Sequence, residues 1–140
     1  VMAMAGRLPH EEFAVALRAC DVFISVPSVD ATAVSLLEAM ATGCGIIISS
    51  LPSSMEWVAD GRSALVVAPR DVEGLAGAML RYANDPDFLA SSGKEALASA
   101  HRWTGFETNM AYVAAVFDAL AGSGSWPAEV SLASLEGGAP

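Results

Sequence analysis

Positive charge is scarce in this chain of 140 residues. Lys and Arg number 7 against 16 Asp and Glu, so the formal net charge at pH 7 is −9. Proteins that bind nucleic acid usually gather Lys and Arg side chains into a surface that contacts phosphates. The composition therefore argues against a nucleic-acid-binding protein, and a phosphate-bearing ligand would depend mainly on backbone N–H groups and a few arginines.

Cysteine is also scarce. Cys20 and Cys44 stand in apolar surroundings, and they form neither a CxxC pair nor the spacing of metal ligands. We expect both to be buried free thiols in a reducing cytoplasm, and we expect no metal site.

Long apolar runs are absent. A membrane-spanning helix needs roughly 18 to 20 consecutive apolar residues, and here Asp21, Asp30, Glu38 and several Gly or Pro residues interrupt every apolar stretch. The first residues show no basic region followed by an apolar core and a cleavage site, although the chain begins with Val. We therefore expect a cytoplasmic protein without a transmembrane segment or secretory signal, and we leave open a peripheral position at the inner face of the membrane.

Hydrophobic residues make up 54% of the chain, which suits buried parallel strands between helices. About four strands are expected, and the last 20 residues change to Gly, Ser, Ala and Pro and are expected to form a flexible tail, residues 121–140. Strands that alternate with helices indicate a Rossmann-like, doubly wound α/β domain over residues 1–120. The expected strands are residues 1–5, 21–26, 45–49 and 64–68. The expected helices are residues 9–20, 33–43, 71–84, 86–101 and 104–120, together with a short helix that carries Glu56, Trp57 and Val58. Trp103 and Tyr112 are expected to anchor the core.

One stretch, PSVDATAVSLLEAMATG at residues 27–43, has the features of a ligand site. Apolar residues recur at helical spacing, and Glu38 is the single carboxylate on the helix. Asp30 stands eight positions earlier, so a helical rise of 1.5 Å per residue predicts a separation of roughly 10 to 12 Å along the axis. Backbone N–H groups from Ala31 to Val34 lie between the two acids, where the helix dipole attracts an anion.

This arrangement is a plausible seat for a nucleotide sugar. The diphosphate would lie at the N–H groups of Ala31, Thr32, Ala33 and Val34, the ribose at Glu38 and the hexose at Asp30. Two plainer interpretations stay open, because Asp30 could be only an N-cap and Glu38 only a solvated surface carboxylate. Arg7, in the turn before the first helix, could contact a base or phosphate, or it could be only a surface charge.

The same stretch resembles the acidic motif in the C-terminal domain of family 4 glycosyltransferases, which are retaining enzymes of GT-B fold. The motif has an acidic residue, seven intervening positions and then Glu-Ala, here Asp30 followed by Glu38 and Ala39. The segments GRLPHEEFAVALRACDVFISVPS before it and GIIISSLPSSMEWVADGRSALVVAPRD and RWTGFETNMAYVAAVF after it follow the order of the family. The resemblance covers about residues 1–120. Asp30 is one methylene shorter than the Glu of many relatives, and Gly45 stands where many have Pro.

The resemblance implies a catalytic role for Asp30 and donor-binding roles for Glu38, Ala31, Thr32, Ala33, Val34 and Arg7. It also implies a UDP- or GDP-sugar donor, an acceptor that is a carbohydrate, lipid or small molecule, no metal and no other cofactor. A relative carries two further strand and helix units, which contain an Arg and a Lys for the diphosphate, and a separate N-terminal domain for the acceptor. The chain is therefore interpreted as a fragment of a glycosyltransferase that is inactive alone.

Two other functions compete with this interpretation. The acidic surface and apolar helices are also compatible with a non-catalytic interaction or nucleotide-sugar-binding module. Another sugar-nucleotide enzyme of the same fold, such as an epimerase, is a weaker alternative, because His10 and His101 lie far from the central stretch in sequence.

Overall fold

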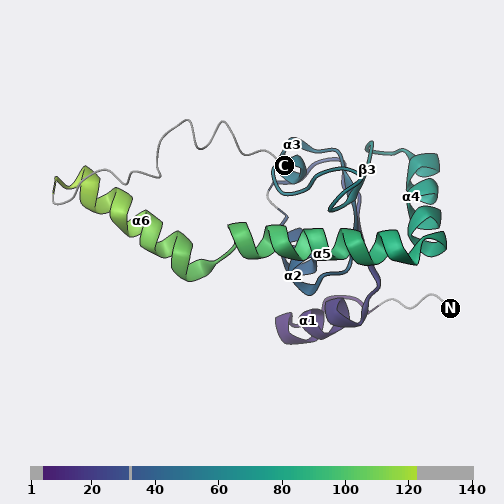
Figure 1. Cartoon of the computed structure of the whole chain (residues 1–140), viewed down its shortest axis with the longest axis horizontal. Coiled ribbons are helices and arrows are strands. Elements are labelled where there is room, and N and C mark those ends of the chain that lie inside the picture. The colour runs from purple at the N-terminus through teal and green to yellow at the C-terminus, as the bar shows by residue number, and fades with distance from the viewer. Residues whose placement is uncertain (1–4, 32, 123–140) are drawn as a thin grey trace.

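Three parallel strands with helices around them form the body of the protein (Figure 1). The computed structural model describes residues 5–31 and 33–122. The strands are β1 (Val22–Ser25), β2 (Gly45–Ser49) and β3 (Leu65–Val67), in the order β1-β2-β3. The expected open parallel α/β sheet is confirmed. Of its four expected strands, the one at residues 1–5 falls outside the described residues except for Ala5.

The central strand β2 organises the core, because all five of its residues are buried. Side chains alternate along a strand, so Ile46 and Ile48 contact one set of helices while Ile47 contacts the other. Ile46 and Ile48 pack with α1 (His10–Ala19), α2 (Val34–Thr42) and the second half of α5 (Pro86–Trp103). Ile47 packs with β3, α4 (Val72–Asn84) and the start of α5. Each buried Ile side chain contributes about 2 to 3 kcal/mol to stability.

Helix starts in the second half follow sequence signals closely. The Asp71 carboxylate accepts a hydrogen bond from Gly74 N at 2.8 Å and caps α4. The Asp85 carboxylate accepts from Phe88 N at 2.9 Å, and Pro86 opens α5. An Asp N-cap and a proline in the first turn both favour helix initiation, which explains why the expected bounds are nearly correct.

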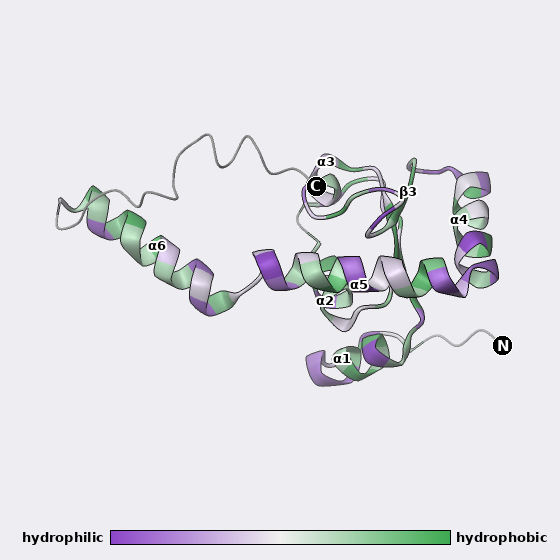
Figure 2. Cartoon of the chain, in the orientation of Figure 1, coloured by the Kyte–Doolittle hydropathy of each residue, from purple (hydrophilic) through white to green (hydrophobic). Residues whose placement is uncertain are grey.

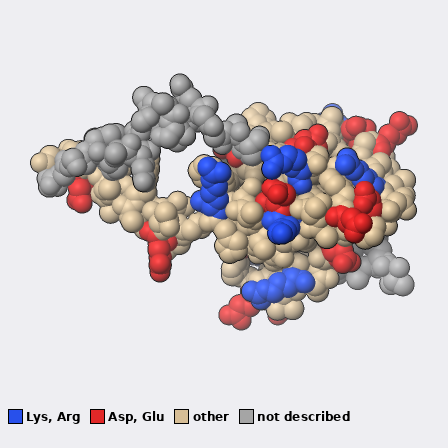
Figure 3. Space-filling view, in the orientation of Figure 1, with Lys and Arg blue, Asp and Glu red and all other residues tan. Residues whose placement is uncertain are grey.

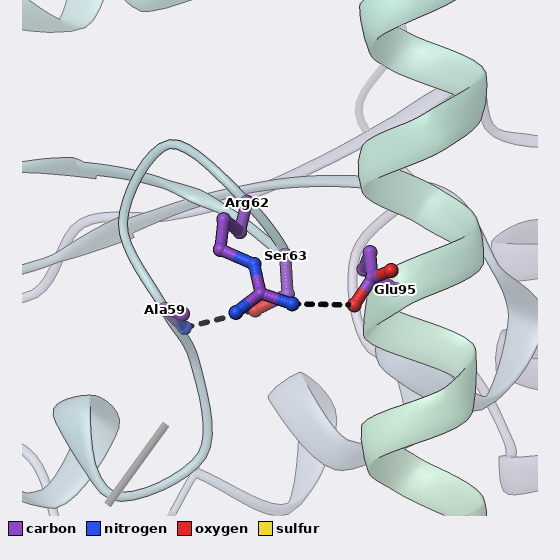
Figure 4. Close-up of polar contacts among 4 residues, drawn as sticks. All are labelled: Ala59, Arg62, Ser63 and Glu95. Atoms are coloured by element: carbon purple, nitrogen blue, oxygen red, sulfur yellow. Dashed lines mark hydrogen bonds and ion pairs between the residues drawn. The ribbon is translucent and has the colours of Figure 1, made fainter.

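Helix α5 packs closely on α2 and on the loop after α3 (Pro52–Met55). Gly93 of α5 faces the backbone of Gly43, which ends α2 in the left-handed conformation at φ 74°. A Cβ atom at Gly45 would overlap Leu89 Cδ1 of α5, which is the end of a flexible side chain. A larger residue at position 45 therefore requires the Leu89 side chain to move. On the surface, Arg62 Nη2 lies 3.3 Å from Glu95 Oε2 of α5 (Figure 4).

Tyr82 joins α4, β2 and α5 inside the core. Its hydroxyl donates or accepts a hydrogen bond with Ser92 Oγ at 2.9 Å and lies 3.2 Å from the carbonyl oxygen of Ile46, to which it can donate. Burial raises the pKa of the Tyr82 hydroxyl above its ordinary value of 10.0, although these two hydrogen bonds act in the opposite direction.

Some expected positions are wrong. Helix α3 ends at Met55, so Glu56 follows the helix rather than lying in its first turn. Trp103 and Tyr112, the expected core anchors, are 40% and 37% exposed. Cys44 is buried as expected but Cys20 is exposed, and both thiols are free.

Helix α6 (Phe106–Leu120) extends away from the body beyond the end of α5 (Figure 1). Its apolar residues, visible in Figure 2, are exposed, with Phe106 at 75% and Phe117 at 67%. The expected helix is confirmed, but its apolar face covers no core among the described residues. No helix in the described ranges has the length and hydrophobicity to cross a bilayer. The expected tail lies outside the described residues from residue 123 onward.

Candidate functional site

The loop from β1 to α2, residues 26–33, leaves the carboxyl end of an open parallel sheet, where ligands of such folds bind. Two serine hydroxyls from the neighbouring strand and helix hold it. Ser49 Oγ donates to Pro27 O at 2.7 Å, and Ser53 Oγ donates to Asp30 O at 3.2 Å. The Asp30 backbone is therefore anchored, while its side chain is exposed to solvent.

Among the described residues, no side chain caps the N-terminus of α2. Ala33 occupies the N-cap position and makes no side-chain hydrogen bond to the first turn. Asp30 lies three residues earlier, so the interpretation of Asp30 as an N-cap is wrong. Ala31 and Val34 are exposed and Ala33 is buried, while Thr32 lies outside the described residues. Leu36 N donates to Ala33 O at 3.0 Å, so within the described residues the N–H groups of Val34 and Ser35 are the first-turn donors left for water or a ligand.

The late start of α2 changes the expected spacing of the two carboxylates. The helix begins at Val34, so a rise of 1.5 Å per residue applies from Val34 to Glu38 and not from Asp30. Asp30 lies four residues before Val34, and Ala33, directly before the helix, is extended with ψ 98°. The expected separation of roughly 10 to 12 Å assumed a helical rise from Asp30 to Glu38, and the helix covers only the part from Val34 onward.

Glu38 lies in the second turn of α2 and is not simply a solvated carboxylate. Its side chain is 27% exposed, and its Oε1 lies 3.3 Å from Nδ1 of His10, the first residue of α1. His10 is 82% exposed, as a solvated first-turn residue should be, yet it contacts Glu38. Arg7 is exposed and lies three residues before His10. The structure thus brings Glu38 beside the start of α1, near the turn that carries Arg7.

A shallow cavity of about 170 Å³ opens on the other side of the same sheet edge. It borders Val26 and Ser28 of the site loop and Arg70 and Asp71 at the start of α4. Arg70 has φ 67°, a left-handed conformation that costs a non-glycine residue roughly 1 kcal/mol or more. No pattern in the sequence predicts that this arginine approaches the site loop.

Charge is mixed on one face of the protein. On the face drawn in Figure 3, Lys and Arg side chains are interspersed with Asp and Glu rather than gathered in one patch. In residues 5–31 and 33–122, no group of three or more His, Cys, Asp or Glu side chains could hold a metal ion. An anionic ligand here would meet mainly backbone dipoles and isolated arginines.

Besides Arg70, three residues at the site were not predicted from the sequence. His10 contacts Glu38 across 28 positions of sequence, and no local spacing predicts such a pair. Ser49 of β2 and Ser53 of α3 belong to the serine-rich stretch at residues 49–54, and its composition alone could not reveal that it holds the residues around Asp30.

Comparison with known proteins places the fold and the family. The family model for glycosyl transferases group 1 matches residues 2–98. A glycogen synthase from Mycobacterium tuberculosis is 31% identical over 99 residues, which cover 71% of this chain and 23% of that protein. The chain therefore spans about a quarter of the length of this relative.

Solved structures agree on the fold. A sucrose-phosphate synthase from Thermosynechococcus elongatus has a TM-score of 0.79 at 24% identity, covering 85% of this chain and 30% of that one. The Anabaena protein Alr3699/HepE, solved in complex with UDP, has a TM-score of 0.72 at 20% identity, covering 74% and 29%. The described sheet and helices are thus an α/β Rossmann-like part of a GT-B glycosyltransferase domain. With the family model matching more than half of its length, the chain belongs to the group 1 glycosyl transferases.

Proposed function

We propose that this chain is part of the donor-binding domain of a family 4 glycosyltransferase, which transfers a hexose from a UDP- or GDP-sugar to a hydroxyl acceptor with retention. The acceptor would be a carbohydrate, a lipid or a small molecule. One observation carries the proposal: Asp30 and Glu38 lie before and after an uncapped helix N-terminus at the carboxyl end of a parallel sheet.

Each group has a role that follows from its chemistry. Asp30, exposed on an anchored loop, accepts hydrogen bonds from sugar hydroxyls near the reacting carbon. Glu38 accepts hydrogen bonds from the ribose hydroxyls. The backbone N–H groups at Ala31 to Val34, at the positive end of the α2 dipole, meet the diphosphate as negative charge develops on the leaving group. Arg7 contacts the base or a phosphate.

The groups assigned to the donor predict that the chain by itself binds the donor weakly and does not transfer its sugar. Its net charge is −9, and the described N–H groups supply little positive charge against a diphosphate. The further cations and the acceptor site would come from other parts of the parent protein, whose N-terminal domain is an expected partner of this one. We expect a dissociation constant of about 1 mM or weaker, which corresponds to roughly −4 kcal/mol.

Nucleotide titration monitored by two-dimensional NMR tests the proposal directly. UDP and GDP are added to the 140-residue chain, to Glu38→Gln and to Glu73→Gln, a control at an exposed acid in the first turn of α4. We expect amide shifts around Ala31 to Leu36 in the unchanged chain and in Glu73→Gln, and weaker ones in Glu38→Gln. Binding that is equal in all three proteins, or absent for both nucleotides, contradicts the proposal.

A second comparison addresses Asp30. UDP-glucose and UDP are titrated against Asp30→Asn, a substitution that keeps the size of the side chain and removes its charge. We expect the variant to lose whatever extra affinity the hexose provides and to keep its affinity for UDP. Equal losses for both ligands would remove Asp30 from the sugar subsite.

A further inference from the structure

The contact between His10 and Glu38 joins two helices at the candidate site. His10 is the first residue of α1, and α1 packs on α2 through Leu17 and Phe13. This packing holds the imidazole Nδ1 at 3.3 Å from Glu38 Oε1. The helix pair therefore sets the backbone position of His10 beside Glu38.

The burial of the two partners is unequal, and this inequality distinguishes the contact from an ordinary surface pair. In the Arg62–Glu95 pair both side chains are exposed, at 71% and 54%. In the His10–Glu38 pair the histidine is 82% exposed and the glutamate only 27%. A pair with one fully solvated member adds little to folding stability.

Charged residues from both helices surround His10. Glu11 and Glu12 follow His10 on α1, Arg7 precedes it, and Glu38 is the single ionisable residue between Val34 and Thr42 on the facing helix. Of these acids, the imidazole contacts Glu38, to which the ribose role is assigned.

We propose that His10 is a positioning residue for Glu38, an inference that rests on the function proposed above. The imidazole holds Oε1, and the lone pairs of Oε2 then accept hydrogen bonds from a pair of vicinal hydroxyls. Without His10, Glu38 samples more rotamers and must be ordered when the nucleotide binds. Ordering one such side chain weakens ribose recognition by roughly three- to tenfold.

The test compares UDP with its 2′,3′-dideoxy analogue, which lacks both ribose hydroxyls. The 140-residue chain is titrated with each ligand by NMR beside four variants: Glu38→Gln, His10→Ala, His10→Lys, which retains an N–H donor at this position, and His101→Ala as a control at another exposed histidine. We expect the unchanged chain, His101→Ala and, in large part, His10→Lys to prefer UDP. Glu38→Gln abolishes that preference. His10→Ala reduces it roughly three- to tenfold, with affinity for the dideoxy analogue unchanged.

The outcomes separate this inference from the proposed function. If Glu38→Gln loses the preference for UDP and His10→Ala keeps it, the positioning role is overturned while the ribose role of Glu38 stands. If the unchanged chain does not prefer UDP, or does not bind it, the ribose role fails and the inference fails with it. Side-chain coupling constants of Glu38 without ligand give a second readout. Identical rotamer averaging in the unchanged chain and in His10→Ala would also overturn the positioning role.

Discussion

Replacing Gly93 with alanine places a methyl group where α5 meets the end of α2. The new Cβ atom would stand on the backbone oxygen of Gly43, and it would lie 3.0 Å from Gly43 C and 3.4 Å from Cys44 C. These are backbone atoms of a helix terminus in the left-handed conformation, so no side chain can rotate away to make room. Relief requires α5 to move away from α2.

The change in the free energy of unfolding of Gly93→Ala follows from two opposing effects. Overpacking of a close contact costs about 1 to 3 kcal/mol, and the upper part of that range applies because the obstacle is backbone. Alanine in place of glycine inside a helix returns about 1 kcal/mol. Moving α5 also loosens Ala96 and Ala100, which are 0% and 2% exposed at the same interface. We expect Gly93→Ala to lower the free energy of unfolding by about 1 to 2 kcal/mol.

Gly77→Ala is the matched control. Gly77 lies in the middle of α4, and a Cβ atom there would have no atom within 4 Å. The substitution therefore keeps the helix-propensity gain without the steric cost, and it should raise the free energy of unfolding by up to about 1 kcal/mol. The two variants change the same residue type in the same way, so their difference isolates the packing of α5 on α2.

Urea unfolding monitored by far-UV circular dichroism measures both variants. With a slope of about 1.5 kcal/mol per M, the midpoint of Gly93→Ala should fall by about 1 M, and that of Gly77→Ala should rise slightly. The reasoning is refuted if Gly93→Ala unfolds at the same midpoint as Gly77→Ala, because the close approach of the two backbones would then have no energetic consequence.

Three further predictions concern Tyr82 and Arg70. Tyr82→Phe removes the hydroxyl that contacts Ile46 O and Ser92 Oγ and should lower stability by about 1 kcal/mol in urea titrations, whereas an unchanged midpoint would show that these hydrogen bonds add nothing. The pKa of Tyr82 is raised in the folded state, so this tyrosine ionises first in the unfolded chain. The stability of the unchanged protein should therefore fall as pH rises above about 10. Tyr82→Phe should show a smaller fall over the same range. Arg70→Gly relieves a residue at φ 67° and should raise stability by up to about 1 kcal/mol, while a loss would show that the arginine makes a contact worth more than the strain.

The predicted helices and strands succeeded where the signal is local. An apolar run rich in isoleucine marks β2, Asp71 followed by helical periodicity marks α4, and Pro86 marks the start of α5. Such patterns act within a few residues, so they need no knowledge of the rest of the fold. The loop and helix that carry Asp30 and Glu38 were predicted for the same reason, with the resemblance to a family supplying their roles.

Errors arose where burial depends on distant segments. Trp103 and Phe106 have the apolar character of core residues, but they lie where α5 leaves the body and α6 begins, with no described element over them. A hydrophobic side chain favours burial, but the tertiary arrangement decides whether another surface is present to bury it.

The sequence by itself determined the alternation of strands and helices, the starts of α4 and α5 and the acidic pair of the candidate site, because each depends on residues close together in the chain. Only the tertiary structure decided that Ala33 rather than Asp30 starts α2, that Ser49 and Ser53 hold the site loop, and that His10 meets Glu38. These contacts form between elements that the sheet brings together from distant parts of the chain, and no periodicity in the sequence records them.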